Sequence, residues 1–262
     1  MLHSEHSTPE ATTPVLSTDM VYMVTGANRG LGLGFCKALL LRPLTTVVAT
    51  VRDPSNAHDL RALQCAEGSR LIVAEIDGFC PKDPTRVVEE LQTTHGLTHL
   101  DTVIANAGIE SWFGPAASIP LDQLREHFEV NALAPLALFQ ATWPLLQRST
   151  NPKFVPISSR LGSVTEIARV QNPAAAYGAS KAMLNYLTCR MHHENAGLVA
   201  FPMSPGFVQT DMGNAGARKA GMKQAVFTVE QSVGGMLRTI DDATREKHGG
   251  TFQSWDGTTF DW

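Results

Sequence analysis

The stretch Val21-Tyr-Met-Val-Thr-Gly-Ala-Asn-Arg-Gly-Leu-Gly32 indicates the fold class of this chain. It places a short apolar strand before three glycines, Gly26, Gly30 and Gly32, and a helical pattern follows at once. Glycines in such a turn allow the helix N-terminus to approach a pyrophosphate without an intervening side chain. A glycine-rich turn that holds no ligand is the alternative, but the flanking strand and helix favour a dinucleotide-binding loop.

Strand-like and helical segments alternate along the rest of the chain. Strands are predicted at residues 21–25, 46–52, 70–76, 102–105, 154–158 and 198–203, and a last short strand near 250–253 is expected to close the sheet edge. Helices are predicted at residues 31–41, 87–95, 121–146 with a bend near Pro135, 178–195, and from a capping box at Thr228 to Ile240. This alternation is typical of a parallel sheet with helices on both faces, so we predict a single doubly wound, Rossmann-type α/β domain over residues 20–262.

The composition is that of an ordinary globular protein, with 43% hydrophobic and 18% charged residues among 262. A formal net charge of -4 gives no electrostatic reason to expect a nucleic-acid or membrane partner, and no apolar run reaches the ~18 residues that a membrane span needs. Residues 1–19 are polar and lack an apolar stretch, which predicts a disordered tail rather than a secretory signal. The cysteines show no paired spacing, so reduced thiols and a cytoplasmic location are expected.

The choice between NADH and NADPH depends on the end of the second predicted strand. Arg52 stands where a carboxylate would bind the ribose hydroxyls of NAD, and Arg29 lies inside the glycine loop. Two arginines there favour the 2′-phosphate of NADPH/NADP+, although each is also compatible with an ordinary surface charge. Asp53 follows directly, and this carboxylate one position out of register keeps NADH open as the alternative.

Two further strand ends bring polar residues to the carboxyl edge of the predicted sheet. Asp77, after the third strand, is placed either to accept a hydrogen bond from the adenine amino group or to serve only as a turn residue. The run Asn106-Ala107-Gly108 ends the fourth strand. Ligands of open α/β sheets bind at this edge, so we expect both segments to lie at the cofactor site.

The run Tyr177-Gly-Ala-Ser-Lys181 places a tyrosine and a lysine on one face of a helix. The lysine ammonium is expected to favour the phenolate, so that Tyr177 exchanges a proton well below its ordinary pKa of about 10. Alone, such a pair is most often a solvated helix face. Because it follows the glycine loop, Asn131 and Ser158-Ser159 in this order, the set indicates proton transfer to a carbonyl oxygen.

These motifs together resemble the short-chain dehydrogenase/reductase superfamily. They are Thr-Gly-x-x-x-Gly-x-Gly from Thr25, Asn106-Ala-Gly108, Ser158-Ser159, Tyr177-x-x-x-Lys181 and Ser204-Pro-Gly-Phe-Val-Gln-Thr-Asp211, and the resemblance covers residues 21–262. Runs 21–30 and 209–213 and the ending at Trp262 resemble the carbonyl-reductase-like branch. Runs 66–70, 95–101, 139–142 and 213–218 are similar to fungal ketoreductases that reduce a side-chain ketone of an anthraquinone.

The resemblance implies a role for each residue of the site. Tyr177 donates a proton to the substrate oxygen, and Lys181 holds the nicotinamide ribose hydroxyls. Ser159 hydrogen-bonds the carbonyl oxygen, Asn131 anchors a water that returns the proton through Lys181, and Thr210 bonds the nicotinamide carboxamide. The predicted cofactor residues are Gly26, Asn28, Arg29, Gly30, Leu31, Gly32, Arg52, Asp77, Asn106, Ala107, Gly108, Tyr177, Lys181, Pro205, Gly206, Val208 and Thr210, and no metal site is predicted.

The assignment of the catalytic serine leaves alternatives. The family places this serine thirteen positions before the tyrosine, which points here to Val164, so we expect a longer loop. Ser159 is chosen because it directly follows the predicted strand, with Ser158 and Ser163 as rival donors. Asn131 also has a purely structural alternative, a backbone hydrogen bond within its helix.

The substrate is expected to be flat and apolar. Trp112, Phe113, Phe207 and Met212 are predicted to line its pocket, although each is also compatible with the core, and residues 207–227 suit a mobile lid. The leading hypothesis is an NADPH-dependent ketoreductase of an aromatic, polyketide-type ketone. A general carbonyl or aldehyde reductase, an epimerase or dehydratase, and a non-catalytic regulator are the alternatives, and the resemblance implies a homodimer or homotetramer.

Overall fold

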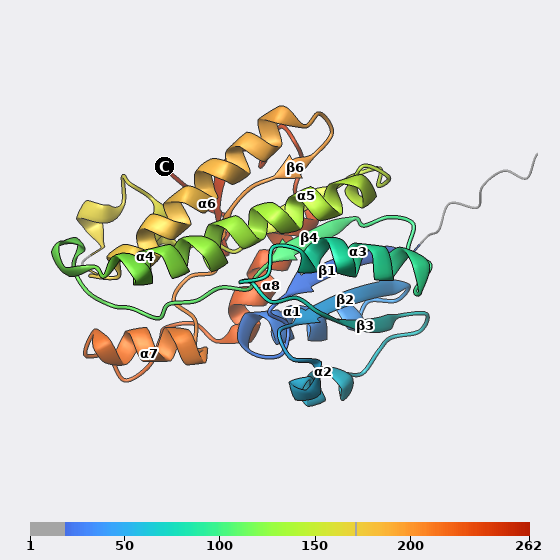
Figure 1. The fold of residues 1–262 in the computed structure, drawn as a ribbon, viewed down its shortest axis with the longest axis horizontal. Coiled ribbons are helices and arrows are strands. Elements are labelled where there is room, and N and C mark those ends of the chain that lie inside the picture. Colours follow the sequence, from blue (N-terminus) through green and yellow to red (C-terminus); the bar gives the residue numbers. More distant parts are fainter. Residues whose placement is uncertain (1–18, 171) are drawn as a thin grey trace, which may run out of the picture.

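A six-stranded, wholly parallel sheet in the order β3-β2-β1-β4-β5-β6 is the centre of the computed structural model, which describes residues 19–170 and 172–262 (Figure 1). The strands are β1 (Met20–Thr25), β2 (Thr45–Val51), β3 (Arg70–Glu75), β4 (Thr102–Ala105), β5 (Lys153–Pro156) and β6 (Val199–Ala200). The strand order reverses between β1 and β4, as a doubly wound sheet requires. The predicted Rossmann-type α/β class is therefore confirmed, while the predicted tail lies outside the described residues apart from Asp19.

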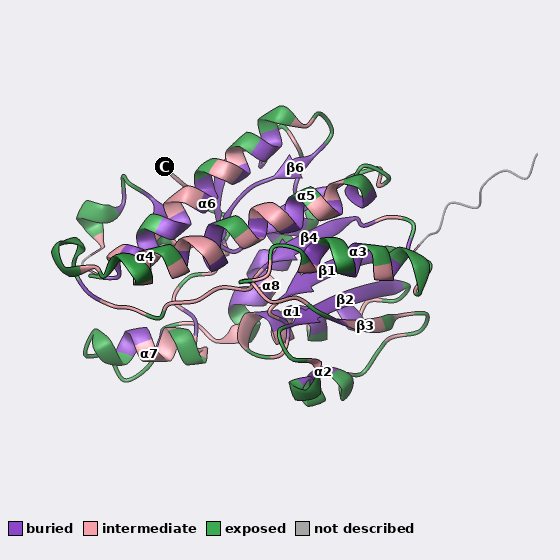
Figure 2. Cartoon of the chain, viewed as in Figure 1, coloured by how far each residue is buried: buried purple, intermediate pink, exposed green. Residues whose placement is uncertain are grey.

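Helices cover both faces of the sheet. On one face lie α1 (Gly30–Leu40) and α8 (Val229–Asp241), and on the other lie α3 (Asp83–Thr93), α5 (Ala134–Leu146) and α6 (Ala175–Glu194). Alternate residues of β1 point to opposite faces, so Tyr22 and Val24 pack with α1 and α8 while Val21 and Met23 pack with α3 and α5. Both faces of β1 are consequently buried from Val21 onward, whereas the edge strand β3 is partly exposed (Figure 2).

The long predicted helix at residues 121–146 is interrupted. It consists of α4 (Leu121–Phe128), a π-helical turn (Glu129–Leu133) and α5. A bend was predicted near Pro135, and the irregularity begins six residues earlier, at Glu129. Pro135 has no N–H to donate to the carbonyl four residues before it, which weakens the α-helical pattern in this turn.

The predicted strand at residues 198–203 is wrong in its extent. Pro202 interrupts it, leaving β6 and a separate β7 (Met203–Ser204). Strand β7 pairs in parallel with β8 (Phe252–Ser254), which pairs antiparallel with β9 (Thr259–Phe260). The predicted last strand thus belongs to a second, three-stranded sheet and does not close the edge of the main one.

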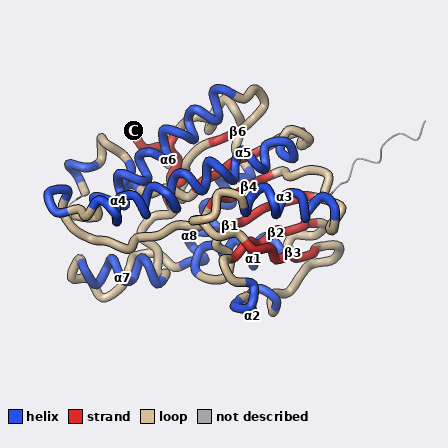
Figure 3. The backbone as a smooth tube through the Cα atoms, viewed as in Figure 1, coloured by secondary structure: helices blue, strands red, loops and turns tan. Residues whose placement is uncertain are grey.

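Two short helices complete the architecture, α2 (His58–Arg61) and α7 (Asp211–Lys219), and neither was predicted. Helix α7 lies within the segment predicted as a lid, with loop on both sides of it, beyond the sheet at the left of the view (Figure 3). Four 3-10 turns lie in the loops, at Pro54–Asn56, Ala116–Ser118, Arg160–Gly162 and Ile167–Arg169. In the part of the chain that the structure describes, no helix is both long and apolar enough to span a bilayer.

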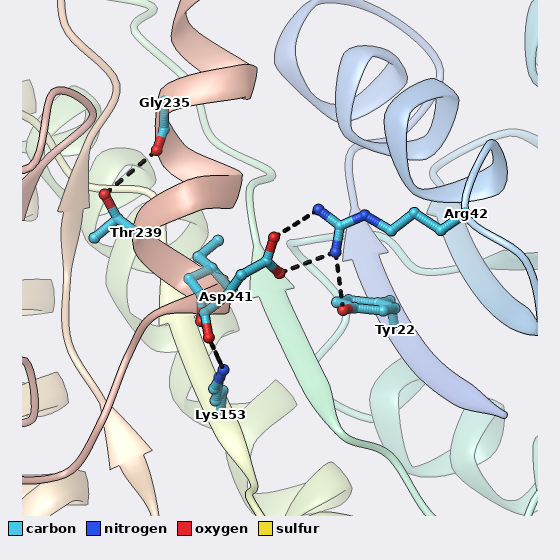
Figure 4. A network of polar contacts seen from close by, with 7 residues as sticks. Tyr22, Arg42, Lys153, Gly235, Thr239 and Asp241 are labelled. Atoms are coloured by element: carbon cyan, nitrogen blue, oxygen red, sulfur yellow. Dashed lines mark hydrogen bonds and ion pairs between the residues drawn. The ribbon is translucent and has the colours of Figure 1, made fainter. Parts of the chain in front are cut away.

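A polar network fixes the amino edge of the sheet, at the opposite end of β1 from the glycine loop (Figure 4). Arg42 forms a bidentate ion pair with Asp241 at the end of α8 and donates to the hydroxyl of Tyr22. Lys153, the first residue of β5, donates to the main-chain carbonyls of Ile240 and Asp241. A cavity of about 300 Å³ lies beside them, remote from the residues that were predicted to bind ligands.

Candidate active site

The glycine loop joins β1 to α1 at the carboxyl edge of the sheet. Gly26 and Gly30 adopt φ of 63° and 54°, a left-handed backbone that favours glycine. A Cβ on Gly32 would lie 2.2 Å from the carbonyl oxygen of Gly26, so a side chain cannot be accommodated there. The loop is a compact backbone cradle at the N-terminus of α1, the geometry that suits a pyrophosphate.

Asn106 and Thr25 hold this loop against the end of β4. The Thr25 hydroxyl accepts hydrogen bonds from the backbone N–H groups of Asn106 and Ala107, each at 3.0 Å. The Asn106 amide donates to the carbonyls of Thr25 and Gly26, at 2.8 and 3.2 Å. The side chain of Asn106 therefore shapes the loop.

Arg52 and Asp53, the two residues that compete for the ribose, are used differently. The Asp53 carboxylate accepts hydrogen bonds from Ser55 and Asn56 in its own 3-10 turn, and these bonds lower its pKa. Among the described residues, the exposed Arg52 side chain makes no hydrogen bond or ion pair. Arg29 pairs with Asp211 of α7 at 3.0 Å, at the surface. The Asp53 carboxylate, which kept NADH open as the alternative, is thus hydrogen-bonded within its own turn.

Asp77 serves as a turn residue at the end of β3. Its Oδ1 accepts from the backbone N–H of Phe79 at 3.0 Å, the alternative that the sequence had left open. A small cavity of about 30 Å³ lies close by, lined by Ile76, Gly78, Ala107 and Val130 among others. The adenine contact of Asp77 stays a prediction.

Tyr177, Lys181 and Ser159 come together near Gly108, at the end of β4. The Lys181 Nζ lies 5.5 Å from the centroid of the Tyr177 ring and donates to the carbonyl of Ile157 at 2.7 Å. Lys181 is almost fully buried, whereas Tyr177 is half-buried. Ser159 follows β5, and its hydroxyl is near enough to Tyr177 to lower the pKa of the phenol.

The rival serines point elsewhere. The buried Ser158 hydroxyl donates to Asn185 Oδ1 at 2.6 Å, and the buried Ser163 hydroxyl donates to the carbonyl of Asp261 at 2.7 Å. Val164, at the usual family spacing, is 70% exposed. Of these candidates, Ser159 is the one that affects the pKa of Tyr177.

Asn131 lies in the π-helical turn and is fully buried. Its amide oxygen accepts from the N–H of Ile109 at 2.8 Å, and its amide nitrogen donates to the carbonyl of Ile109 and to the hydroxyl of Ser180. The Ser180 hydroxyl in turn donates to the carbonyl of Tyr177. The side chain of Asn131 therefore joins the loop after Gly108 to α6 and has no polar atom left over.

The pKa shifts of the pair differ from the expectation. Burial and the negative charge of Glu110 raise the pKa of Tyr177, although the hydrogen bond from Ser159 opposes this. Burial lowers the pKa of Lys181 to about 7. Lys181 turns toward Ile157 and is not among the groups that shift the Tyr177 pKa in this arrangement, so the expected lowering of that pKa by the lysine stays a prediction.

The segment after β7 closes over the glycine loop. The Thr210 hydroxyl caps α7 by accepting from the N–H of Gly213, and its methyl group lies 3.2 Å from the position of a Cβ on Gly30. Asn28, Leu31, Gly108 and Pro205 are half-buried and Gly206 is exposed around this edge, whereas Val208 is buried. Thr210 is therefore the predicted residue of this segment that approaches the loop most directly.

The predicted substrate residues divide into two groups. Phe113 and Phe207 lie beneath α7, where the Lys219 Nζ is 4.8 Å from the Phe113 ring and Phe207 is 3.8 Å from the position of a Cβ on Gly216. Trp112 folds back against Gly114 of its own loop, and Met212 is 36% exposed. The structure thus brings two of the four under one helix.

Two residues of the site were missed, Thr25 and Glu110. Thr25 was quoted in the glycine motif but received no role, and its position directly before Gly26 was the available signal. Glu110 lies two residues after Gly108 of the Asn-Ala-Gly run, and its negative charge affects the pKa of Tyr177. A single acidic residue in a loop gave no pattern from which this could be predicted.

A doubly wound sheet with a glycine cradle and a Tyr–Lys pair at its carboxyl edge defines a dinucleotide-binding oxidoreductase. A family model described as short chain dehydrogenase matches residues 20–221. The chain belongs to the short-chain dehydrogenase/reductase family, as its motifs predicted.

Relatives and solved structures place the chain within this family. It is 44% identical to a norsolorinic acid ketoreductase of Dothistroma septosporum, over 92% of each chain. It is 43% identical to the norsolorinic acid ketoreductase of Aspergillus parasiticus, over 99% of this chain and 98% of the relative. The NADPH-bound carbonyl reductase from chicken fatty liver superposes with a TM-score of 0.80 at 28% identity, over 93% of this chain and 99% of that one. The resemblance to fungal ketoreductases and to carbonyl reductases is confirmed.

Proposed function

We propose that the protein is an NADPH-dependent ketoreductase that reduces a ketone of an aromatic, polyketide-type compound, with Tyr177 as the proton donor. The observation that carries this proposal is the position of the buried Lys181, whose Nζ lies 5.5 Å from the Tyr177 ring, with Ser159 near enough to lower the pKa of the phenol. The substrate class is supported by the two relatives, each named a norsolorinic acid ketoreductase.

The residues at the carboxyl edge fit a dinucleotide phosphate. The cradle of Gly26, Gly30 and Gly32 lies at the N-terminus of α1. Arg52, which has no partner among the described residues, would hold the 2′-phosphate together with Arg29. When bound, NADPH supplies the hydride. Lys181 would bind the nicotinamide ribose and Thr210 the carboxamide.

Tyr177 and Ser159 would act together on the carbonyl oxygen of the substrate. A raised pKa keeps the Tyr177 phenol protonated at neutral pH, which is the state that a proton donor requires. The Ser159 hydroxyl is near enough to influence the pKa of this phenol, so both groups would reach one substrate oxygen. They would stabilise and then protonate the oxygen as its negative charge develops.

Lys181 would return the proton to Tyr177. Its pKa of about 7 allows it to lose and regain a proton near neutral pH. The water that feeds it would bind the main-chain carbonyl of Asn131, because the amide of this residue is fully engaged and Pro135 has no N–H to bond that carbonyl. The role of Asn131 is thus proposed for its backbone, not for its side chain.

NADPH oxidation over a panel of ketones tests the proposal, with aryl and anthraquinone ketones beside small aliphatic aldehydes. We expect turnover of the bulky aromatic ketones, and Tyr177→Phe should lower kcat/KM by about 10³-fold. Arg52→Ala should raise the KM for NADPH about tenfold and leave that for NADH nearly unchanged.

Two outcomes of this panel would contradict the proposal. Tyr177→Phe activity within a few-fold of the unchanged protein would exclude Tyr177 as the proton donor. Turnover of small aldehydes alone would indicate a general carbonyl reductase, the activity named for the chicken liver structure.

A further inference from the structure

Glu110 is a charged side chain that the proposed mechanism does not use. It lies two residues after Gly108, in the loop that leaves β4, and it is half-buried. Its Oε2 is 4.0 Å from the position of a Cβ on Gly216, so the carboxylate lies between this loop and α7. Among the described residues, it makes no hydrogen bond and no ion pair within 4 Å.

Glu110 lies close to several of the residues proposed to contact the substrate. The negative charge of Glu110 raises the pKa of the Tyr177 hydroxyl. Phe207, like Glu110, lies close to Gly216 of α7. Lys219 is the cation that acts on Glu110, but its Nζ lies over the ring of Phe113. The carboxylate thus lies near the aromatic side chains beneath α7, and its charge raises the pKa of the Tyr177 phenol.

A partly desolvated carboxylate without a donor is unfavourable, and burial accordingly raises the pKa of Glu110. A ligand that brings a hydroxyl donor would remove this penalty, because hydrogen bonds to an ionised acceptor are strong. A ligand without such a group would leave the carboxylate buried and unpaired. Glu110 therefore has the properties of a residue that selects substrates by a hydroxyl group.

We infer that Glu110 is a specificity-determining residue, and that the substrate is a hydroxylated aryl ketone whose hydroxyl donates a hydrogen bond to the Glu110 carboxylate. The aromatic rings of Phe113 and Phe207 would flank the ring system of the substrate, and Tyr177 would face its ketone. This inference rests on the proposed ketoreductase function and adds the feature that the substrate must carry.

The test compares acetonaphthones that carry one ring hydroxyl, at different positions, with their methyl ethers. We expect the unchanged protein to prefer at least one hydroxyl compound to its ether by about 10- to 100-fold in kcat/KM. Glu110→Ala should abolish this preference by slowing the hydroxyl compound while leaving the ether nearly unaffected. Glu110→Gln keeps the side-chain volume and should reduce the preference, and it provides the measurement if Glu110→Ala does not fold.

Lys219→Gln is the matched control, since it removes the neighbouring charge and leaves the carboxylate. The preference should survive this change. Equal loss in Lys219→Gln and Glu110→Ala, uniform over all ketones, would indicate an ion pair that holds α7 and would overturn the inference. No preference in the unchanged protein, or one that Glu110→Ala leaves intact, would also overturn it. Absence of turnover on every aryl ketone would instead contradict the ketoreductase proposal, and the inference with it.

Discussion

Two lysines are buried at opposite edges of the same sheet, and their surroundings differ. Lys153, at the amino edge, is 8% exposed and donates to two carbonyls at the end of α8 (Figure 4). Burial lowers its pKa, while Asp241, Asp242 and Asp101 act in the opposite direction. Lys181, at the carboxyl edge, is 3% exposed, donates to the single carbonyl of Ile157, and has a pKa lowered by burial alone.

The difference is between a lysine with structural partners and a lysine whose proposed role is chemical. The burial of the Lys153 charge is partly offset by carboxylates and by a helix C-terminus, both of which favour a cation. The charge of Lys181 has no such balance, so this ammonium retains unused hydrogen-bonding capacity and a pKa near neutrality. A buried lysine without compensation costs stability, and it points to function where it lies beside a ligand site.

The largest expected effect is on catalysis. Lys181→Met should lower kcat/KM by about 10³-fold, because it removes both the proposed proton source and the proposed ribose contact. Lys153→Met, measured per folded molecule, should stay within a few-fold of the unchanged protein. Steady-state NADPH oxidation by both variants checks this, and an equal loss in the two would mean that the contrast between the lysines has no functional meaning.

The second-largest expected effect is a loss of stability when Lys153 is replaced. Lys153→Met should lower the free energy of unfolding by about 3 kcal/mol, since it leaves buried carbonyls and nearby carboxylates without their cation. Urea unfolding followed by tryptophan fluorescence measures the change. A loss below about 0.5 kcal/mol, the level of an ordinary surface substitution, would show that Lys153 is not an anchor.

The smallest expected effect is a gain in stability. Lys181→Met should stabilise the ligand-free protein at pH 7 by about 1–3 kcal/mol, because it removes an uncompensated buried ammonium. The folded pKa is about 7 and the unfolded one about 10.4, so between these values the unfolded chain binds more protons. The stability of the unchanged protein relative to the variant should therefore rise with pH from 7 toward 10. Urea unfolding of both proteins across this range would contradict the assignment if their difference were constant.

Local signals explain what the sequence could predict of the fold. The strand at residues 102–105 and the capping box between Thr228 and Gln231 are confirmed, because each depends on a few adjacent residues. Helix α7 was not predicted, since Gly213 and Gly216 lower its helical propensity and a cap from Thr210 helps to hold it. The division of the last strands between two sheets likewise depends on pairing with residues about fifty positions away.

In the candidate active site, too, local patterns were predictable and contacts between distant segments were not. The Tyr177 and Lys181 pair was predictable because its spacing alone places both residues on one helix face. The turn of Lys181 toward Ile157 was not, since this partner lies 24 residues earlier on another element. Nor was Glu110, one carboxylate among 25 acidic residues, whose significance depends on the fold of α7 over it.

The π-helical turn at Glu129–Leu133 amounts to one extra residue inserted into a long helix. Each residue advances an α-helix by about 100°, so the insertion shifts the phase of α5 relative to α4 by that angle. This shift lets Asn131 face Ile109 and Ser180 while Leu138 and Phe139 still face the sheet. The composition of the turn matters less than its length: a deletion of one residue would rotate either the site or the core out of place, whatever amino acids remained.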